Sequence, residues 1–120
     1  MRRIKYPKTD ANHSIVPDFI NGVGGVYGGL ILTYRDVSKL GGSMLDWVIS
    51  LGPLVIFVEV KTEEAYFSKD CGMTKGERDF FQTWPGCKAF AVTEADMAEI
   101  VQNHLDAAYS LQAALERKGK

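Results

Sequence analysis

The 120-residue chain has few cysteines, no excess of charge and no long apolar segment, and each absence argues against a class of protein. Cys71 and Cys87 have neither CxxC spacing nor a nearby histidine partner, so we expect reduced thiols and no disulfide framework or zinc site. The net charge of -1 counts against strong nonspecific binding to nucleic acid. Glu59 and Lys61 interrupt the most hydrophobic run too early for it to cross a bilayer.

What remains is an ordinary globular composition at a length that suits one domain. Apolar residues make up 46% of the chain and charged residues 24%, which is enough apolar material for a core. The basic start lacks the apolar segment of a signal peptide, so we expect a cytoplasmic protein. We predict a single domain over residues 1–120 with flexible basic ends at 1–9 and 116–120. These ends either contact phosphates or are simply solvated.

Hydrophobic periodicity and turn signals predict alternating helices and strands. The segment 62–72 is charged, and we expect it to be irregular. The order is helix, three strands, helix, strand and helix, which is typical of an α/β fold with a mixed central sheet flanked by helices. The predicted elements are a helix over 13–22, a strand over 30–34, a hairpin over 45–61, a helix from Thr74 to a stop at 85–86, a strand over 88–92 and a long last helix opening at 93–96.

The central feature is the hairpin, in which two apolar, β-rich runs flank a break that contains Gly52 and Pro53. A two-residue loop of Leu51 and Gly52 would pair Ser50 with Pro53. Residue 46 would then lie opposite Phe57.

Three charged side chains share one face of this hairpin. Because side chains alternate along a strand, Asp46, Glu59 and Lys61 lie on the same side of an otherwise apolar sheet. Two carboxylates in one place attract a hard divalent ion, so we expect Asp46, Glu59 and the carbonyl of Val60 to bind Mg²⁺ or Mn²⁺. Lys61 beside that ion suits phosphate-ester hydrolysis, in which the ammonium stabilises the transition state or orients the nucleophile. The alternative is a structural ion pair at a strand edge.

The spacing of these residues resembles a known signature. Asp46, twelve intervening residues, and then Glu59, Val60 and Lys61 resemble the motif of the PD-(D/E)xK nucleases. Nearly the whole chain resembles their VRR-NUC and Holliday-junction-resolvase-like group of small phage and bacterial endonucleases. The resemblance implies a restriction-endonuclease-like core of order αβββαβα. The segments that carry this wider resemblance are residues 10–12, 38–42, 74–77, 84–86 and 91–96.

The resemblance also implies a function. By this resemblance, the chain would be a Mg²⁺- or Mn²⁺-dependent endodeoxyribonuclease that hydrolyses DNA phosphodiester bonds, with branched DNA as one candidate substrate. It would act in a bacterium or a phage-infected cell. Asp46, Glu59 and Lys61 would be catalytic, and Glu77 would be a fourth member. The alternative is a nuclease-fold phage accessory factor that binds DNA or protein with weak or no catalysis. Candidate DNA contacts are Ser38, Lys39, Lys75 and Arg78.

Three positions depart from the pattern of that group. Leu45 stands where a proline is usual before the aspartate, and Glu77 stands where a glutamine is usual. Ser14 stands near the place of a first-helix glutamate that assists metal binding. Glu77 is therefore either a metal ligand or only the capping residue of its helix. Asp18, one turn after Ser14, is the other candidate to complete the metal site.

The resemblance implies a homodimer as well, since small resolvase-like nucleases usually act as pairs. The long apolar stripe of the last helix could form the dimer interface. It could equally pack on the sheet of its own chain.

Overall fold

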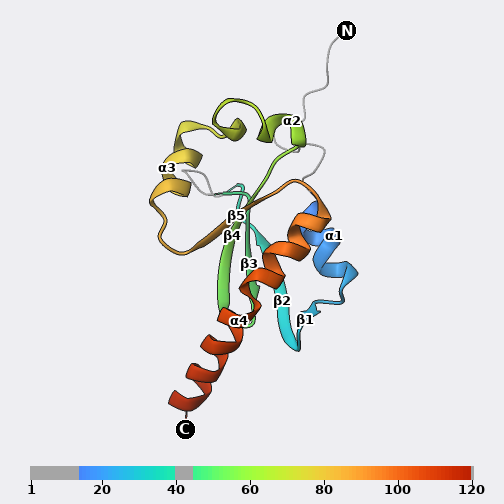
Figure 1. The fold of residues 1–120 in the computed structure, drawn as a ribbon, viewed down its shortest axis with the longest axis vertical. Helices are drawn as coiled ribbons and strands as arrows, with labels where there is room; N and C mark the ends of the chain where they lie inside the picture. Colours follow the sequence, from blue (N-terminus) through green and yellow to red (C-terminus); the bar gives the residue numbers. More distant parts are fainter. Residues whose placement is uncertain (1–13, 40–44, 120) are drawn as a thin grey trace.

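The computed structural model describes residues 14–39 and 45–119, and its centre is an open mixed sheet of five strands (Figure 1). Neighbouring strands from β1 to β4 are antiparallel, whereas β5 is parallel to β4. The fold is therefore α/β. In sheet order the strands are β1 (Val26–Tyr27), β2 (Leu30–Asp36), β3 (Trp47–Leu51), β4 (Leu54–Val60) and β5 (Cys87–Ala91).

The helices begin at polar caps that the sequence makes visible. Thr74 and Glu77 form a capping box before α3, and Thr93 and Asp96 form a second one before α4, so both predicted starts are confirmed. The predicted motif at 10–12, position 13 of the first helix and positions 40–42 lie outside the described residues. The helices are α1 (Ile15–Gly22), α2 (Glu63–Tyr66), α3 (Lys75–Thr83) and α4 (Glu94–Lys118), with a 3-10 turn, η1 (Lys69–Gly72), between α2 and α3.

One face of the sheet forms the main core with α1 and α4. The side chains of β3 and β4 that point to this face alternate with those that point away from it, as a sheet covered on that side requires. The first half of the apolar stripe of α4 packs here, which is one of the two roles predicted for it. Further along, Leu115 is 52% exposed, and Figure 1 shows α4 continuing past the end of the sheet. Core residues include Val16, Ile20, Ile49, Ile56, Val58, Met97 and Val101.

Aromatic side chains of α3 cover part of the other face. Phe57 of β4 points away from the main core, and its ring contacts the rings of Phe80 and Trp84, each at 5.2 Å between centroids. Phe81 contacts Phe90 of β5 at 4.7 Å. These contacts fix α3 above the face that carries the predicted charged residues.

The hairpin register differs from the predicted one by two residues. Leu51 pairs with Leu54, so the connecting residues are Gly52 and Pro53, and Gly52 has a φ of +55°. A two-residue hairpin turn with a positive φ at its first position requires glycine there, which explains the shift. The predicted pairing of Ser50 with Pro53 is therefore wrong, as is the placement of residue 46 opposite Phe57.

Three short elements were not expected. The segment 62–72, predicted to be irregular, contains α2 and η1, and a two-residue strand, β1, precedes β2. Elements of two to four residues span only about one period of a hydrophobic pattern, so no repeat of the pattern signals them. Within the described ranges, no helix combines the length and the hydropathy that a membrane span needs.

The turn between β1 and β2 offers a test of how closely this fold is packed. Gly28 and Gly29 both have positive φ. A Cβ at Gly28 would lie 2.7 Å from the hydroxyl of Tyr109 and 2.9 Å from Leu105. A Cβ at Gly29 would meet nothing within 4 Å. Gly28→Ala should therefore lower the free energy of unfolding by about 1.5–2 kcal/mol, because the ends of the Tyr109 and Leu105 side chains must also shift, and Gly29→Ala by about 1 kcal/mol. Denaturant unfolding measures both, and equal losses would contradict close packing of this turn on α4.

Candidate metal centre

Two acidic residues meet where the ladder between β3 and β4 ends. Because Trp47 pairs with Val58, the next step of the register brings Asp46 beside Glu59. The backbone N–H of Asp46 donates to Glu59 Oε1 at 3.3 Å, and Asp46 Oδ2 accepts the N–H of Val60 at 3.1 Å. Each carboxylate is thus tied to the backbone of the facing chain segment, which fixes both in place. The expected shared face of Asp46 and Glu59 survives the corrected register, because a shift of two residues keeps the side-chain alternation.

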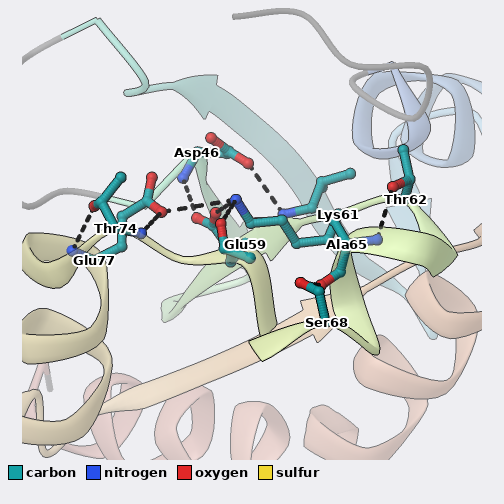
Figure 2. A network of polar contacts seen from close by, with 10 residues as sticks. Asp46, Glu59, Lys61, Thr62, Ala65, Ser68, Thr74 and Glu77 are labelled. Atoms are coloured by element: carbon teal, nitrogen blue, oxygen red, sulfur yellow. Dashed lines mark hydrogen bonds and ion pairs between the residues drawn. The ribbon is translucent and has the colours of Figure 1, made fainter. Parts of the chain in front are cut away.

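The third carboxylate comes from the first turn of α3. Glu77 Oε1 accepts the N–H of Thr74 at 3.0 Å, and the hydroxyl of Thr74 accepts the N–H of Glu77 at 3.1 Å. The capping box therefore orients the carboxylate of Glu77. One oxygen from each of Asp46, Glu59 and Glu77 lies within 4.8 Å of the others (Figure 2). Residues far apart in the sequence thus form one cluster at the end of the sheet.

Lys61 occupies the same cluster. Its Nζ lies 3.1 Å from Glu59 Oε2 and 3.7 Å from Glu77 Oε1 (Figure 2). It also donates to the carbonyl of Gly72 at 3.1 Å. With the three carboxylates ionised, one ammonium leaves a local excess of two negative charges. Such an excess in a partly buried place favours a divalent cation.

Burial and charge shift the proton affinities of this cluster. The side chain of Glu59 is fully buried, and desolvation, together with the charges of Asp46 and Glu77, raises its pKa from 4.5 to about 7 despite the opposing effect of Lys61. Burial alone would lower the pKa of Lys61. The carboxylates of Glu59, Glu77 and Asp46 outweigh that effect and raise it, so Lys61 stays protonated.

The donor set fits a hard divalent ion. Carboxylate oxygens are the ligands that Mg²⁺ and Mn²⁺ prefer. Oxygens that share one octahedral Mg²⁺ lie about 3–4 Å apart, because each metal–oxygen bond is about 2.0–2.1 Å long. The observed spacing of up to 4.8 Å closes to that range with side-chain shifts of less than about 1 Å. Asp46, Glu59 and Glu77 are therefore the residues that would hold the ion.

The other predicted site residues lie around this cluster or away from it. Asp18 on α1 accepts a hydrogen bond from the hydroxyl of Ser14 at 2.9 Å, and among the described residues the carboxylate cluster takes in Glu77 and leaves out Asp18. The backbone N–H of Val60 bonds Asp46, and its carbonyl as a metal ligand stays a prediction.

The four candidate DNA contacts divide between two segments. Ser38, at the end of β2, makes hydrogen bonds to Asp36 through its hydroxyl and its N–H, and Lys39 beside it is exposed. On α3, which also carries Glu77, Lys75 pairs with Asp79 at 3.0 Å and Arg78 pairs with Asp70 at 3.6 Å. Their contacts with DNA stay predictions.

Sequence reasoning missed the hydrogen bond from Lys61 to the backbone carbonyl of Gly72. The carbonyl of Gly72 belongs to the segment expected to be irregular, and a backbone acceptor leaves no mark in the sequence. A local signal did exist for α2, because Thr62 accepts the N–H of Ala65 at 3.1 Å as an N-cap, with Glu63 and Glu64 in the first turn. That pattern is typical of a helix start.

The raised pKa of Glu59 predicts how stability depends on pH when EDTA removes metal ions. Between pH 4.5 and about 7 the folded chain keeps a proton that the unfolded chain releases, so the free energy of unfolding should fall as pH rises through this window, by roughly 3 kcal/mol. Glu59→Gln, a neutral mimic, should remove this slope and be the more stable protein at pH 8. Denaturant titrations measure both, with the exposed Glu99→Gln as control. Parallel profiles of wild type and Glu59→Gln would contradict the assignment.

Comparison with known proteins adds no assignment. No protein-family model matches the chain, and searches of curated proteins and of solved structures also give no match. The three carboxylates and the lysine are therefore the evidence on function.

Proposed function

We propose that the chain is a Mg²⁺- or Mn²⁺-dependent endodeoxyribonuclease with a restriction-endonuclease-like core. The observation that carries the proposal is the approach of Asp46, Glu59 and Glu77 to within 4.8 Å of one another, with the Lys61 ammonium 3.1 Å from Glu59. A structural ion pair needs one carboxylate for one ammonium. Burial, together with the two additional carboxylates, raises the pKa of Glu59, and a bound cation would offset the repulsion among the three carboxylates.

The chain's own groups have distinct parts in this chemistry. Asp46, just before β3, and Glu59 on β4 would hold the ion, and the backbone hydrogen bonds of both carboxylates fix their positions. A divalent cation held there would neutralise the negative charge that develops on the scissile phosphate. The Lys61 ammonium, directed at the same place, stabilises the transition state or orients the attacking water. Its raised pKa keeps it positively charged for this task.

The arrangement of the elements gives further support. Apart from β1, α2 and η1, the chain runs through α1, three antiparallel strands, α3, the parallel strand β5 and α4. Asp46 and Glu59 lie where the pairing of β3 and β4 ends, and α3, which packs on the same face of the sheet, adds Glu77. This placement agrees with the resemblance to PD-(D/E)xK nucleases in the spacing of Asp46, Glu59 and Lys61.

DNA cleavage tests the proposal directly. The full chain should cut a four-way junction or linear duplex in Mn²⁺ or Mg²⁺ and not in EDTA. Lys61→Ala should lower the rate at least about 100-fold, because it removes a charge directed at the transition state. Arg35→Ala on β2, which removes an exposed positive charge that has no assigned role, is the matched control and should cut at the wild-type rate.

Equal cleavage by wild type and Lys61→Ala would overturn the catalytic assignment. Binding of the junction with no cleavage in either metal would favour the accessory-factor alternative.

The double role of Glu77 allows a separate test that does not depend on activity. Glutamine also completes a capping box and removes one negative charge from the cluster, so Glu77→Gln should not lower the free energy of unfolding in EDTA. It should nevertheless weaken Mn²⁺ binding about tenfold or more in calorimetry, because a charged ligand is lost. Glu64→Gln on α2 is the control for removing an exposed charge nearby. Unchanged Mn²⁺ affinity in Glu77→Gln would restrict this residue to its capping role.

A further inference from the structure

Lys61 donates a hydrogen bond to a backbone carbonyl, that of Gly72, which lies outside the carboxylate cluster. Its Nζ donates to the carbonyl of Gly72 at 3.1 Å. Glu59 and Glu77, with which it also forms ion pairs, belong to the carboxylate cluster (Figure 2). A cation bound by that cluster would compete for those carboxylates and repel the ammonium. The neutral carbonyl of Gly72 lies outside the cluster and would go on accepting its hydrogen bond.

The turn that presents this carbonyl has an unusual backbone. Three consecutive residues, Asp70, Cys71 and Gly72, have φ values of +58°, +53° and +72°. A left-handed conformation is unfavourable for residues with a Cβ, and two of these three have one. The turn is closed by hydrogen bonds from Cys71 N–H to Ser68 O at 3.1 Å and from Met73 N–H to Asp70 O at 2.9 Å. Strained backbone of this kind persists only where surrounding contacts enforce it.

Two contacts hold the turn against its neighbours. Gly72 packs on α2 so closely that a Cβ would lie 3.1 Å from both the Cβ and the carbonyl oxygen of Ala65. On the other side, Asp70 pairs with Arg78 of α3 at 3.6 Å. The carbonyl of Gly72 is thus fixed relative to α3, the same helix that supplies Glu77.

We infer that the turn over residues 68–73 is a positioning element that holds the Lys61 ammonium at the metal centre through the carbonyl of Gly72. The inference deepens the proposed function and rests on it for its catalytic meaning. Gly72 is a positioning residue, since it acts through Lys61. The left-handed backbone directs its carbonyl, and the absence of a side chain lets the turn approach α2.

Three substitutions, one at position 72 and a matched pair at position 71, test the backbone of the turn. Gly72→Ala introduces a Cβ where both the conformation and Ala65 oppose it. Cys71→Val places a β-branched residue at positive φ without adding a group beside Lys61, and Cys71→Gly is its matched control because glycine favours that conformation. The position-71 pair still decides the question if Gly72→Ala does not fold.

The readout is the hydrogen exchange of the Lys61 ammonium, followed by NMR on the full chain in Mg²⁺ and in EDTA. Ammonium protons exchange slowly with water only when they are held in hydrogen bonds and shielded. The signal is assigned by its loss in Lys61→Ala. Wild type and Cys71→Gly should show slow exchange in both conditions. Gly72→Ala and Cys71→Val should exchange at least about tenfold faster, as expected for loss of a charge-assisted hydrogen bond.

Kinetics separate positioning from a general loss of structure. In DNA cleavage, Gly72→Ala and Cys71→Val should lower kcat about tenfold while KM and Mn²⁺ affinity stay at wild-type values, and Cys71→Gly should match wild type. Loop-dependent exchange without cleavage in any variant would overturn the nuclease proposal and leave the positioning role standing. Folded Gly72→Ala and Cys71→Val proteins with wild-type exchange would overturn the positioning role.

Discussion

The structure depends on one electrostatic constraint, the placement of a fully buried carboxylate, Glu59, among other carboxylates. Burial and the nearby Asp46 and Glu77 raise the pKa of Glu59 to about 7, and the positive charge of Lys61 opposes them. Near neutral pH the Glu59 side chain is therefore present in both its protonated and its ionised form, and the two forms need different partners. The protonated acid needs only hydrogen bonds, whereas the anion needs more positive charge than one lysine supplies. A divalent cation satisfies the anion, which links metal binding to the protonation state of one buried group.

The fold satisfies this constraint with secondary structure that is rigid before any ligand binds. The β3–β4 pairing fixes the separation of Asp46 and Glu59, and hydrogen bonds between each carboxylate and the opposite backbone extend that pairing by one step. The apolar contacts of Phe57 with α3 then set the height of Glu77 above the sheet. Side chains that lie on strands and helix starts move little, so the arrangement favours ligands of one size and coordination geometry.

Sequence alone predicted the centre better than its surroundings, for a physical reason. The shared face of Asp46, Glu59 and Lys61 depends only on the two-residue alternation of a strand, so it survived a register that was wrong by two residues. The register itself depends on the conformation of Gly52, which the sequence leaves open between two loops. The contact of Gly72 with Lys61 was beyond reach because it joins a backbone carbonyl to a side chain through a turn with no periodic pattern. The choice between Asp18 and Glu77 needed the packing of α3, which is a tertiary property.

Glu77 shows how one residue can link stability to function. Its Oε1 accepts the backbone N–H of Thr74 and also lies 3.7 Å from Lys61 Nζ, so the atom that caps α3 faces the candidate metal centre. The cap holds the carboxylate in place through a contact that α3 needs for its own stability. A ligand held in this way loses little conformational entropy when an ion binds. Glutamine would cap the helix equally well but would bring no charge, so a glutamate here adds negative charge to a cluster that already has an excess. That addition is unfavourable for the free protein and favourable for the metal-bound one, which is the balance expected at a site built to take up a cation.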